Sequence, residues 1–454
     1  MVRRATLERD WTKGSIVRNL LSLSLPIIMT QTLNQVGQFV DMIWVGRLGA
    51  VSMAGVGISS LIIMMVNLVN TGLFVGLRAM VARHIGAGDV KGANHVAQQA
   101  FVIAAVFAVF IAAIGIFFAE PIFVLLGVEP EVVTQGAAYM RIQFVGLVTL
   151  SLLHIAQTMM QASGDTVTPM WIAVFFRILH VVLDPFLIFG WWIFPQLGVT
   201  GAALTQVIAQ GVGGAIGLGL LFSGRTRLRL TLNEFHLDRN VIWRLVKVGT
   251  PAAITGVQRS LPYVVLIWFI TPFGYVAVAA HSLVQRIIDS FVQMPGVGMG
   301  DGSGVIGGHN LGAGRPERAE RTGWTAVGLT TGLMIIVSVV VWFWAEHIVR
   351  LFNSEPDLVT IASAFLRIQI IGYMLFGFVM VLSHTLEGIG DTMPVMLATL
   401  ISMWVLQVPL GYFLPKFTSL GVYGVRWAIV AALVMRAVAF FVYFKSGRWK
   451  RKIV

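Results

Sequence analysis

The chain contains no cysteine and little charge. The absence of cysteine from its 454 residues excludes disulfides, thiolate metal sites and cysteine nucleophiles. Charged residues make up 11% of the sequence, whereas hydrophobic residues make up 57%. No GxxxxGK[ST] motif is present, which disfavours an ATPase encoded in the chain itself. A composition so poor in charge and so rich in apolar side chains predicts an integral membrane protein.

Long apolar stretches recur along the chain, and each reaches the length of about 20 residues that a membrane-spanning helix needs. They lie at residues 16–45, 54–78, 93–118, 132–159, 169–192, 199–222, 241–271, 278–299, 325–345, 361–382, 393–414 and 422–444. The stretches lack the alternation of a barrel strand, so we expect helices. The first is too long for a signal peptide and lacks a cleavage site, so we expect it to be retained. The predicted fold is an all-α membrane protein with twelve transmembrane helices.

Positive charge is unevenly distributed over the connecting segments. If both termini are cytoplasmic, the inner segments carry basic residues that include Arg9, Lys13, Arg83, Arg229, Arg318 and Lys450. The outer loops keep only Arg47, Arg350 and Lys416. Because short loops rich in Lys and Arg stay in the cytoplasm, we expect a multi-pass protein of the cell's cytoplasmic (inner) membrane with both termini inside. Anionic lipid explains the net charge of +12 without a nucleic-acid partner.

The two halves of the sequence resemble one another at an offset of about 225 residues. The matching positions are Leu25-Pro26 and Thr250-Pro251, Ile43-Trp44 and Ile267-Trp268, residues 85–88 and 311–314, residues 164–166 and 390–392, residues 197–201 and 420–424, and Ser223 and Ser446. Six matches in register predict an N-lobe at residues 1–222, a cytoplasmic linker at 223–239 and a C-lobe at 240–454. Six helices in each lobe place the pseudo-twofold axis along the membrane normal. Such two-lobed repeats usually transport substrates by alternating access.

The sequence also resembles a known family in particular motifs. These are Phe39-Val40-Asp41-Met42-Ile43-Trp44 in the first helix, Gly-Ala-Gly after the second and eighth helices, and Leu183-Asp184-Pro185 in the fifth. Over essentially its whole length the chain resembles a multidrug and toxic compound extrusion (MATE) transporter. The pairing of Asp41 with Asp184 resembles the DinF-like branch. The carboxylate of the NorM-like branch is replaced here by Arg259, which argues against a sodium site built on C-lobe carboxylates.

Two predicted helices each present a polar stripe that ends in a carboxylate. Asn34, Gln38 and Asp41 are spaced i, i+4 and i+7, and His180 and Asp184 are spaced i and i+4. Ionisable groups within apolar helices are usually functional, so both stripes are expected to face the lobe interior. Tyr139, His154 and Gln157 on the fourth helix are expected to join this pocket.

The proposed coupling centre consists of Asp41, Asp184 and His180. In the resemblance to the DinF-like branch, an Asn normally stands at the position of His180, and His154 is a second such exchange. A carboxylate beside an imidazole titrates as a coupled unit. Pro185 and Pro26 each remove a backbone donor and favour a helix bend. Protonation of the two aspartates is expected to change helix bending and expel the substrate outward.

The expected partners are lipophilic organic cations, protons or sodium ions, and the lipid bilayer. The resemblance favours protons and cationic drugs. We expect a monomer without a cofactor or a resident metal. Asp165, Asp391 and Glu387 are expected to cap helices near the cytoplasm, whereas the sequence assigns no role to Asp301.

Three other functions remain open. A flippase for lipid-linked oligosaccharides or other amphipathic anions shares the superfamily architecture, and Arg177, Arg259 and Arg286 would suit a pyrophosphate. Asp41 and Asp184 argue against it, because they make the cavity negative. A membrane enzyme is disfavoured because the chain has neither His-Glu-x-x-His nor Gly-x-Ser-x-Gly. A pore fits the repeat and the isolated acids less well than gated exchange.

Overall fold

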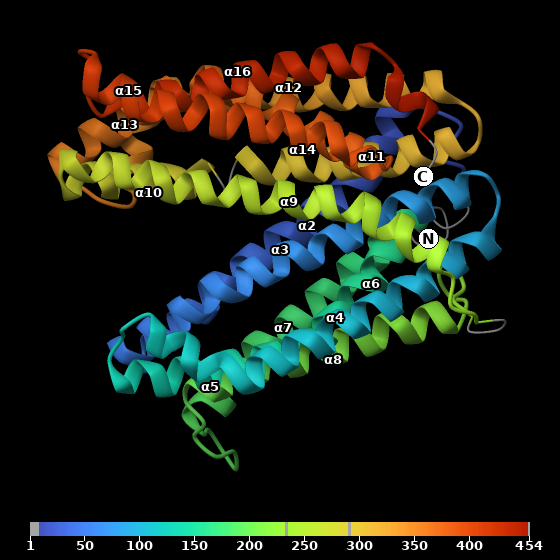
Figure 1. Ribbon diagram of the computed structural model, residues 1–454, viewed down its shortest axis with the longest axis horizontal. Coiled ribbons are helices and arrows are strands. Elements are labelled where there is room, and N and C mark those ends of the chain that lie inside the picture. Colours follow the sequence, from blue (N-terminus) through green and yellow to red (C-terminus); the bar gives the residue numbers. More distant parts are fainter. Residues whose placement is uncertain (1–8, 232–234, 289–291, 453–454) are drawn as a thin grey trace. The chain divides into compact units, whose positions relative to one another are not determined.

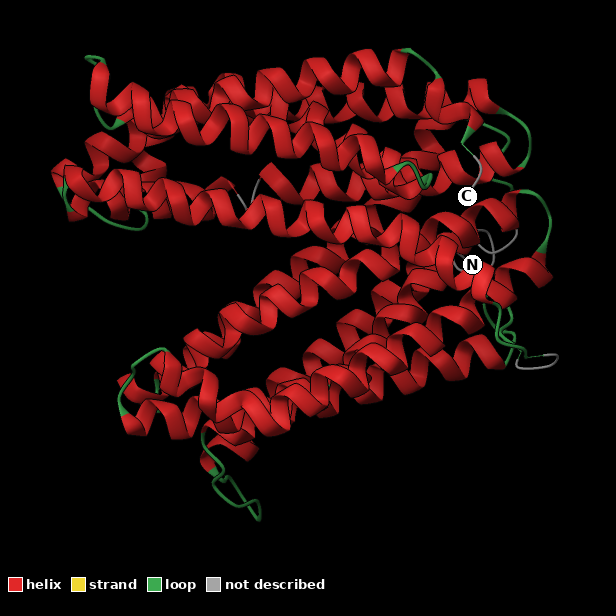
Figure 2. Cartoon of the chain, in the orientation of Figure 1, coloured by secondary structure: helices red, strands yellow, loops and turns green. Residues whose placement is uncertain are grey.

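The computed structural model describes residues 9–231, 235–288 and 292–452, and these residues form helices and loops without strands (Figure 2). The helices up to the middle of the chain are α2 Ile16–Gly46, α3 Ala50–Gly86, α4 Val90–Leu125, α5 Pro130–Val145, α6 Leu147–Ser163, α7 Val167–Phe189, α8 Val199–Phe222 and α9 Arg239–Ile270 (Figure 1). The later elements are η1 Thr271–Phe273, α10 Tyr275–Ile288, α11 Met294–Gly312, α12 Pro316–Arg350, α13 Pro356–Gly388, α14 Thr392–Leu400, η3 Ile401–Gln407, α15 Val408–Phe417, α16 Tyr423–Lys445 and η4 Arg448–Arg451.

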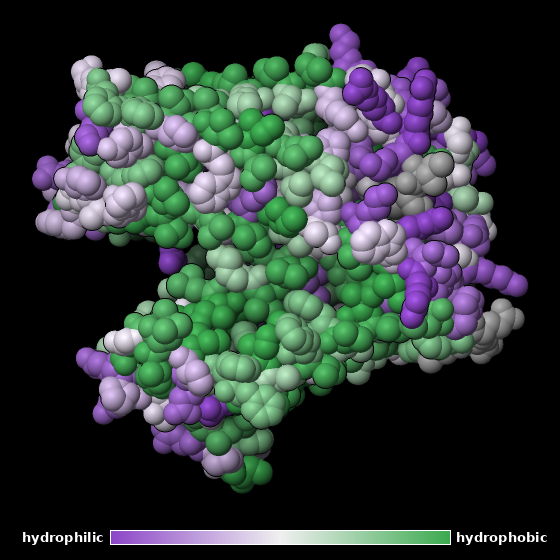
Figure 3. Space-filling model, viewed as in Figure 1, coloured by the Kyte–Doolittle hydropathy of each residue, from purple (hydrophilic) through white to green (hydrophobic). Residues whose placement is uncertain are grey.

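The helices are long and apolar enough for a multi-pass membrane protein. Within the described residues, ten helical segments meet the requirements for a span, and α5 with α6 forms an eleventh if this bent pair counts as one. α10 is a shorter apolar helix. All twelve predicted stretches are helical over most of their described residues, although residues 289–291 of the eighth lie outside the described part of the chain. Hydrophobic side chains cover the middle of the helices, and hydrophilic ones gather near their ends (Figure 3).

The chain packs as two units. The first contains Met1–Asp10 and Met29–Gly249, and the second contains Trp11–Ile28 and Thr250–Val454. α2 and α9 therefore pass from one unit to the other, and each does so within three residues of an internal proline, Pro26 in α2 and Pro251 in α9. Proline removes one helical hydrogen bond, which makes these two crossing points weak places in otherwise continuous helices.

The predicted fourth helix is divided into α5 and α6 at Gly146, with an angle of 43° between the two parts. Val207 of α8 lies beside this break. A Cβ atom on residue 146 would lie 2.2 Å from Val207 Cγ2, so the glycine permits a close approach of that side chain. The Gly146 carbonyl accepts a hydrogen bond from the Thr149 hydroxyl at 2.7 Å, which satisfies a backbone group at the break.

The predicted eleventh helix changes its winding in the middle. Residues Ile401–Gln407 form a π-helical segment between α14 and α15. Pro409 follows this segment. Because proline carries no N–H and displaces the preceding carbonyl groups, a wider turn ahead of it is a physically reasonable adjustment.

The two Gly-Asp-Thr motifs have different local roles. The Asp165 carboxylate accepts a hydrogen bond from the backbone N–H of Thr168 at 3.0 Å, which confirms the predicted cap at the start of α7. Asp391 makes no side-chain cap at α14, so its predicted role as a cap is wrong. Its carboxylate instead accepts a hydrogen bond from the Tyr443 hydroxyl and lies 3.2 Å from Lys452 Nζ.

Candidate functional site

Asp184 is held at the contact between α7 and α8. A Cβ atom at Gly201 would lie 2.3 Å from the Leu187 carbonyl oxygen, so the glycine permits a very close approach of the two helices. Thr205 stands one turn after Gly201 on α8, and its hydroxyl donates a hydrogen bond to Asp184 Oδ1 at 2.6 Å. The close helix contact thus brings a donor to a carboxylate that is only 1% exposed.

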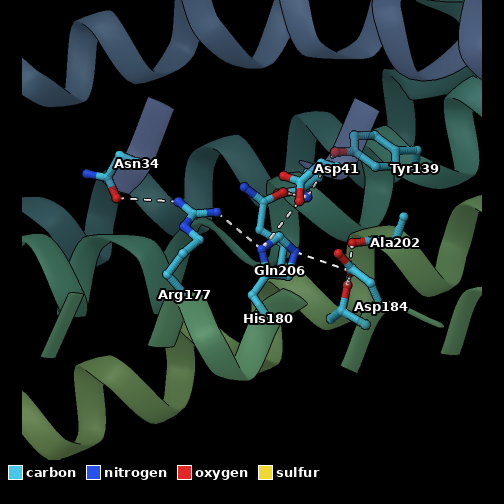
Figure 4. A network of polar contacts seen from close by, with 10 residues as sticks. Asn34, Asp41, Tyr139, Arg177, His180, Asp184, Ala202 and Gln206 are labelled. Atoms are coloured by element: carbon cyan, nitrogen blue, oxygen red, sulfur yellow. Dashed lines mark hydrogen bonds and ion pairs between the residues drawn. The ribbon is translucent and has the colours of Figure 1, made fainter. Parts of the chain in front are cut away.

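His180 lies between the two predicted coupling carboxylates (Figure 4). Its Nδ1 is 3.5 Å from Asp41 Oδ1, and its Nε2 is 3.5 Å from Asp184 Oδ1. The His180 side chain is buried, whereas that of Asp41 is 29% exposed. The imidazole therefore lies between the buried carboxylate of Asp184 on α7 and the partly exposed carboxylate of Asp41 on α2. Sequence spacing predicted that His180 and Asp184 share a face of α7, and the fold brings Asp41, the third predicted coupling residue, to the other side of the imidazole.

Arg177 joins the same cluster from the preceding turn of α7. Its Nη2 donates to Asn34 Oδ1 at 3.3 Å, and its Nη1 lies 3.2 Å from His180 Nδ1. Gly37 of α2 makes room for the guanidinium, because a Cβ atom there would lie 2.1 Å from Arg177 Nη1. Two polar contacts, Asn34 with Arg177 and Asp41 with His180, thus join α2 to α7 (Figure 4).

A second layer of polar groups lies beside Asp41. Figure 4 places Tyr139 of α5 and Gln206 of α8 on this side of the cluster. Gln143 donates a hydrogen bond to Gln206 Oε1 at 2.5 Å and another to the Tyr139 hydroxyl at 3.4 Å. Gln143 and Gln206 were not singled out from the sequence. Gln143 stands four residues after Tyr139, and this spacing was the available signal.

The other three predicted pocket residues have different surroundings. Gln38 is exposed on α2. His154 packs edge-to-face against Phe74, with ring centroids 5.2 Å apart. Gln157 is buried, and its Nε2 has no hydrogen-bond partner among the residues that the structure describes. A role for these three residues in binding stays a prediction.

The cluster can hold a small cation. Asp41, His180 and Asp184 each offer one ligand atom, and these three atoms lie within 4.8 Å of one another. Asp184 Oδ2 has no hydrogen-bond partner within the described part of the chain, so the carboxylate retains accepting capacity. Two carboxylates against one guanidinium leave a charge of −1 when His180 is neutral, and a proton or another monovalent cation would neutralise it.

The second unit contains a polar cluster that sequence reasoning largely missed. His384 Nδ1 on α13 lies 2.9 Å from Asp301 Oδ1 on α11. One turn further along α13, Glu387 lies 3.5 Å from Arg259 Nη2, which also donates to Ser383 Oγ at 2.6 Å. Glu387 is thus an ion-pair partner within α13 and not the predicted helix cap. Ionisable residues within apolar helices were the available signal.

Comparison with known proteins assigns the family. The family model described as MatE matches residues 26–186 and 251–413. A relative described as "Probable multidrug resistance protein YpnP", from Bacillus subtilis, is 27% identical over 97% of both chains. The solved structure described as "Crystal structure of MATE in complex with MaL6" superposes with a TM-score of 0.89 at 25% identity, over 96% of this chain and 97% of that one. Another, described as "Reverse polarity of binding pocket suggests different function of a MOP superfamily transporter from Pyrococcus furiosus", gives 0.89 at 25% identity over 98% of both. The chain belongs to the MATE family of multidrug efflux transporters.

Proposed function

We propose that this protein is a secondary active exporter that exchanges protons for lipophilic organic cations by alternating access. The observation that carries the proposal is the position of His180 between Asp41 and Asp184, at 3.5 Å from a carboxylate oxygen of each. Cation export requires negative charge in the cavity, and the two carboxylates outnumber the single guanidinium of Arg177. The same groups can accept protons, which would make proton uptake and cation binding compete for one site.

Thr205 is suited to keep α7 and α8 connected in both protonation states. Its hydroxyl carries one proton and has two acceptors in reach, Asp184 Oδ1 at 2.6 Å and the Ala202 carbonyl at 2.9 Å. When Asp184 is ionised, the hydroxyl donates to the carboxylate. When Asp184 is protonated, the carboxyl group donates to Thr205 Oγ1, and the hydroxyl turns to Ala202. A hydrogen bond between α7 and α8 is retained in each case.

The contact between α2 and α7 responds differently. It depends on the pairs Asp41–His180 and Asn34–Arg177. Protonation of Asp41 removes its negative charge and weakens its attraction to the Arg177 guanidinium, so α2 is released from α7. Pro26 gives α2 a weak point at which it can bend when this contact changes. We propose that this release is the step that turns proton binding into substrate expulsion.

The alternative function, a flippase for amphipathic anions, rests on arginines within the helices. In the structure, Arg259 is engaged by Glu387 and Ser383, and Arg177 interacts electrostatically with Asp41 and Asp184. Arg286 is exposed on α10. These partners reduce the positive charge available to a pyrophosphate. The similar transporter from Pyrococcus furiosus is described as having a binding pocket of reverse polarity that suggests a different function. A flippase is therefore one outcome of the transport measurement.

Transport of a fluorescent organic cation by purified protein in liposomes tests the proposal. Flux is measured under an imposed proton gradient and then under a sodium gradient, for the wild type, Asp41→Asn and Asp184→Asn. Asp357→Asn, an exposed acid at the start of α13, is the matched control. Proton-driven flux that is lost in both site variants and kept in the control supports the proposal. Flux driven only by the sodium gradient would show that the coupling ion is sodium and not the proton. Folded protein that shows no cation flux under either gradient would favour the flippase.

We also propose that the protein works as a monomer with both termini in the cytoplasm. Because the chain has no cysteine, a single cysteine introduced at either end is a unique probe. A membrane-impermeant thiol reagent added to intact cells should leave both end positions unlabelled and should label them after the membrane is opened. Labelling of both end positions in intact cells would show that the termini lie outside the cytoplasm and would contradict the proposed orientation.

A further inference from the structure

The segment that precedes α9 lies against the start of α4 through several hydrogen bonds. Gln99 of α4 donates from Nε2 to the His236 carbonyl at 2.8 Å, and its Oε1 accepts from the backbone N–H of Asp238 at 3.2 Å. Gln98 donates to the Thr231 carbonyl at 2.7 Å. The two bonds of Gln99 hold the backbone at His236 and Asp238 against α4. They therefore place the side chains of His236 and Asp238 beside α4 before any ligand binds.

Three potential metal ligands meet at this place. His95 stands one turn before Gln99 on the same face of α4. The rings of His95 and His236 stack with their centroids 4.4 Å apart, and His95 Nε2 lies 3.4 Å from Asp238 Oδ2. One ligand atom from each of the three residues lies within 4.8 Å of the other two. None of these residues belongs to the transport site described above.

The carboxylate of Asp238 is oriented by the helix that follows it. Its Oδ1 accepts hydrogen bonds from the backbone N–H groups of Asn240 at 2.8 Å and Val241 at 3.3 Å. This cap at the start of α9 leaves Oδ2 directed toward His95. An aspartate carboxylate is ionised at neutral pH. An oriented, ionised carboxylate beside two imidazoles is a donor set seen in transition-metal sites.

We propose that His95, His236 and Asp238 form a binding site for a divalent transition metal of the zinc class. Two imidazole nitrogens and one carboxylate oxygen suit Zn²⁺, Ni²⁺ or Cu²⁺, whereas Mg²⁺ and Ca²⁺ prefer oxygen ligands alone. Zinc bonds of about 2.0–2.2 Å place tetrahedral ligand atoms about 3.4 Å apart. The most distant pair therefore has to approach by at most about 1.4 Å, and the exposed side chain of His236 can supply this movement. A water molecule would complete the coordination of such a metal.

The same face of the chain offers a matched comparison. His84 Nδ1 lies 2.9 Å from Asp89 Oδ2, and Asp89 caps α4 through Oδ1 and the Gly92 N–H. This pair also combines a histidine with a helix-capping aspartate. It belongs to none of the groups of three ligands found in the described part of the chain, so it should not retain a metal. His84→Ala is therefore the control variant.

Metal binding by the full-length protein tests the proposal. The protein is purified in detergent with an affinity tag that contains no histidine, stripped with a chelator, dialysed against dilute Zn²⁺ and analysed for bound zinc. The variants are His95→Ala, His236→Ala, Asp238→Asn and His84→Ala. Asparagine still caps a helix, so Asp238→Asn removes the charge while preserving α9. The variant His180→Ala is included to measure how much of the bound zinc is held by the transport site.

The wild type should bind one equivalent of zinc that each of the three site variants loses and that His84→Ala and His180→Ala keep. Substitution of Co²⁺ should give the visible absorption of a tetrahedral site, and that signal should disappear in the same three variants. Equal zinc content in the wild type and the His95→Ala/His236→Ala double variant would overturn the proposal. Loss of the same equivalent in His84→Ala would overturn it as well, because the binding would then not depend on this cluster.

Discussion

Gly37→Ala tests whether the backbone of α2 has to accommodate Arg177. The added Cβ atom would lie 2.1 Å from Nη1, 2.2 Å from Cζ and 2.4 Å from Nε of Arg177. No rotation of the new methyl group relieves such a contact, so the guanidinium must move. It then leaves Asn34 Oδ1 and His180 Nδ1, which it contacts at 3.3 and 3.2 Å. We expect both lower stability and slower transport.

The magnitude follows from three competing terms. Replacing glycine by alanine within a helix stabilises by about 1 kcal/mol. Overpacking costs about 1–3 kcal/mol, and the one interhelical hydrogen bond that is lost, from Arg177 to Asn34, adds about 0.6 kcal/mol. The net destabilisation is about 0.6–2.6 kcal/mol. For a unit of roughly 200 residues, that corresponds to a fall in Tm of at least about 1 °C.

Thermal unfolding in detergent measures this effect, with Gly57→Ala as the control. Gly57 lies in α3 with open space around its hypothetical Cβ, so this variant should keep or raise the Tm. In the double variant Gly37→Ala/Arg177→Ala the clash is absent, and the two effects should combine less than additively. If Gly37→Ala has the same Tm and transport rate as Gly57→Ala, the placement of Arg177 against α2 is refuted.

Further substitutions test other contacts. Thr205→Val should reduce proton-driven flux about tenfold or more, because it removes a hydrogen-bond donor worth about 1.5–3 kcal/mol to a charged carboxylate. Thr205→Ser should keep most of the flux. Equal flux in the two variants would contradict the role of the hydroxyl. Gly201→Ala places Cβ 2.3 Å from the Leu187 carbonyl oxygen and should destabilise by about 1–3 kcal/mol in thermal unfolding, while Gly219→Ala, with open space, should not. Asp89→Ala should cost about 1 kcal/mol through the lost cap of α4. The Gly92 N–H lowers the pKa of Asp89. The cap therefore stabilises the protein fully above the ordinary carboxyl pKa of about 3.9, and this stabilisation is lost as the pH falls through the lowered pKa. A difference in stability between the wild type and Asp89→Ala that grows on acidification would contradict this.

Much of the architecture could be predicted from composition and periodicity alone. The twelve apolar stretches and the motif spacing indicated an all-helical membrane protein before any contact was known. The breaks inside helices could not be predicted in this way. α5 and α6 meet at Gly146, where Val207 of another helix occupies the space beside the glycine, and sequence spacing contains no information about that neighbour.

The same distinction applies to motifs. The two Gly-Asp-Thr repeats are identical in sequence, yet Asp165 caps a helix and Asp391 contacts Tyr443 and Lys452. A local motif determines which hydrogen bonds are available to a carboxylate. Residues distant in the sequence decide which of them it makes, because a nearby cation or hydroxyl competes with the backbone donors.

The sequence itself determined that Asp41, His180 and Asp184 are costly polar groups in apolar helices, since the energetic penalty of burying charge depends only on the side chain and its surroundings in lipid. It also determined the pairing of His180 with Asp184, because residues four apart share a helix face. Only the tertiary structure decided that Asp41 meets the other side of His180, that Thr205 supplies the donor to Asp184, and that His95 meets His236 and Asp238. These contacts join helices and loops far apart in the chain, and their distances are set by packing at residues such as Gly37 and Gly201, where the absence of a side chain is visible in the sequence but the atom that fills its place is not.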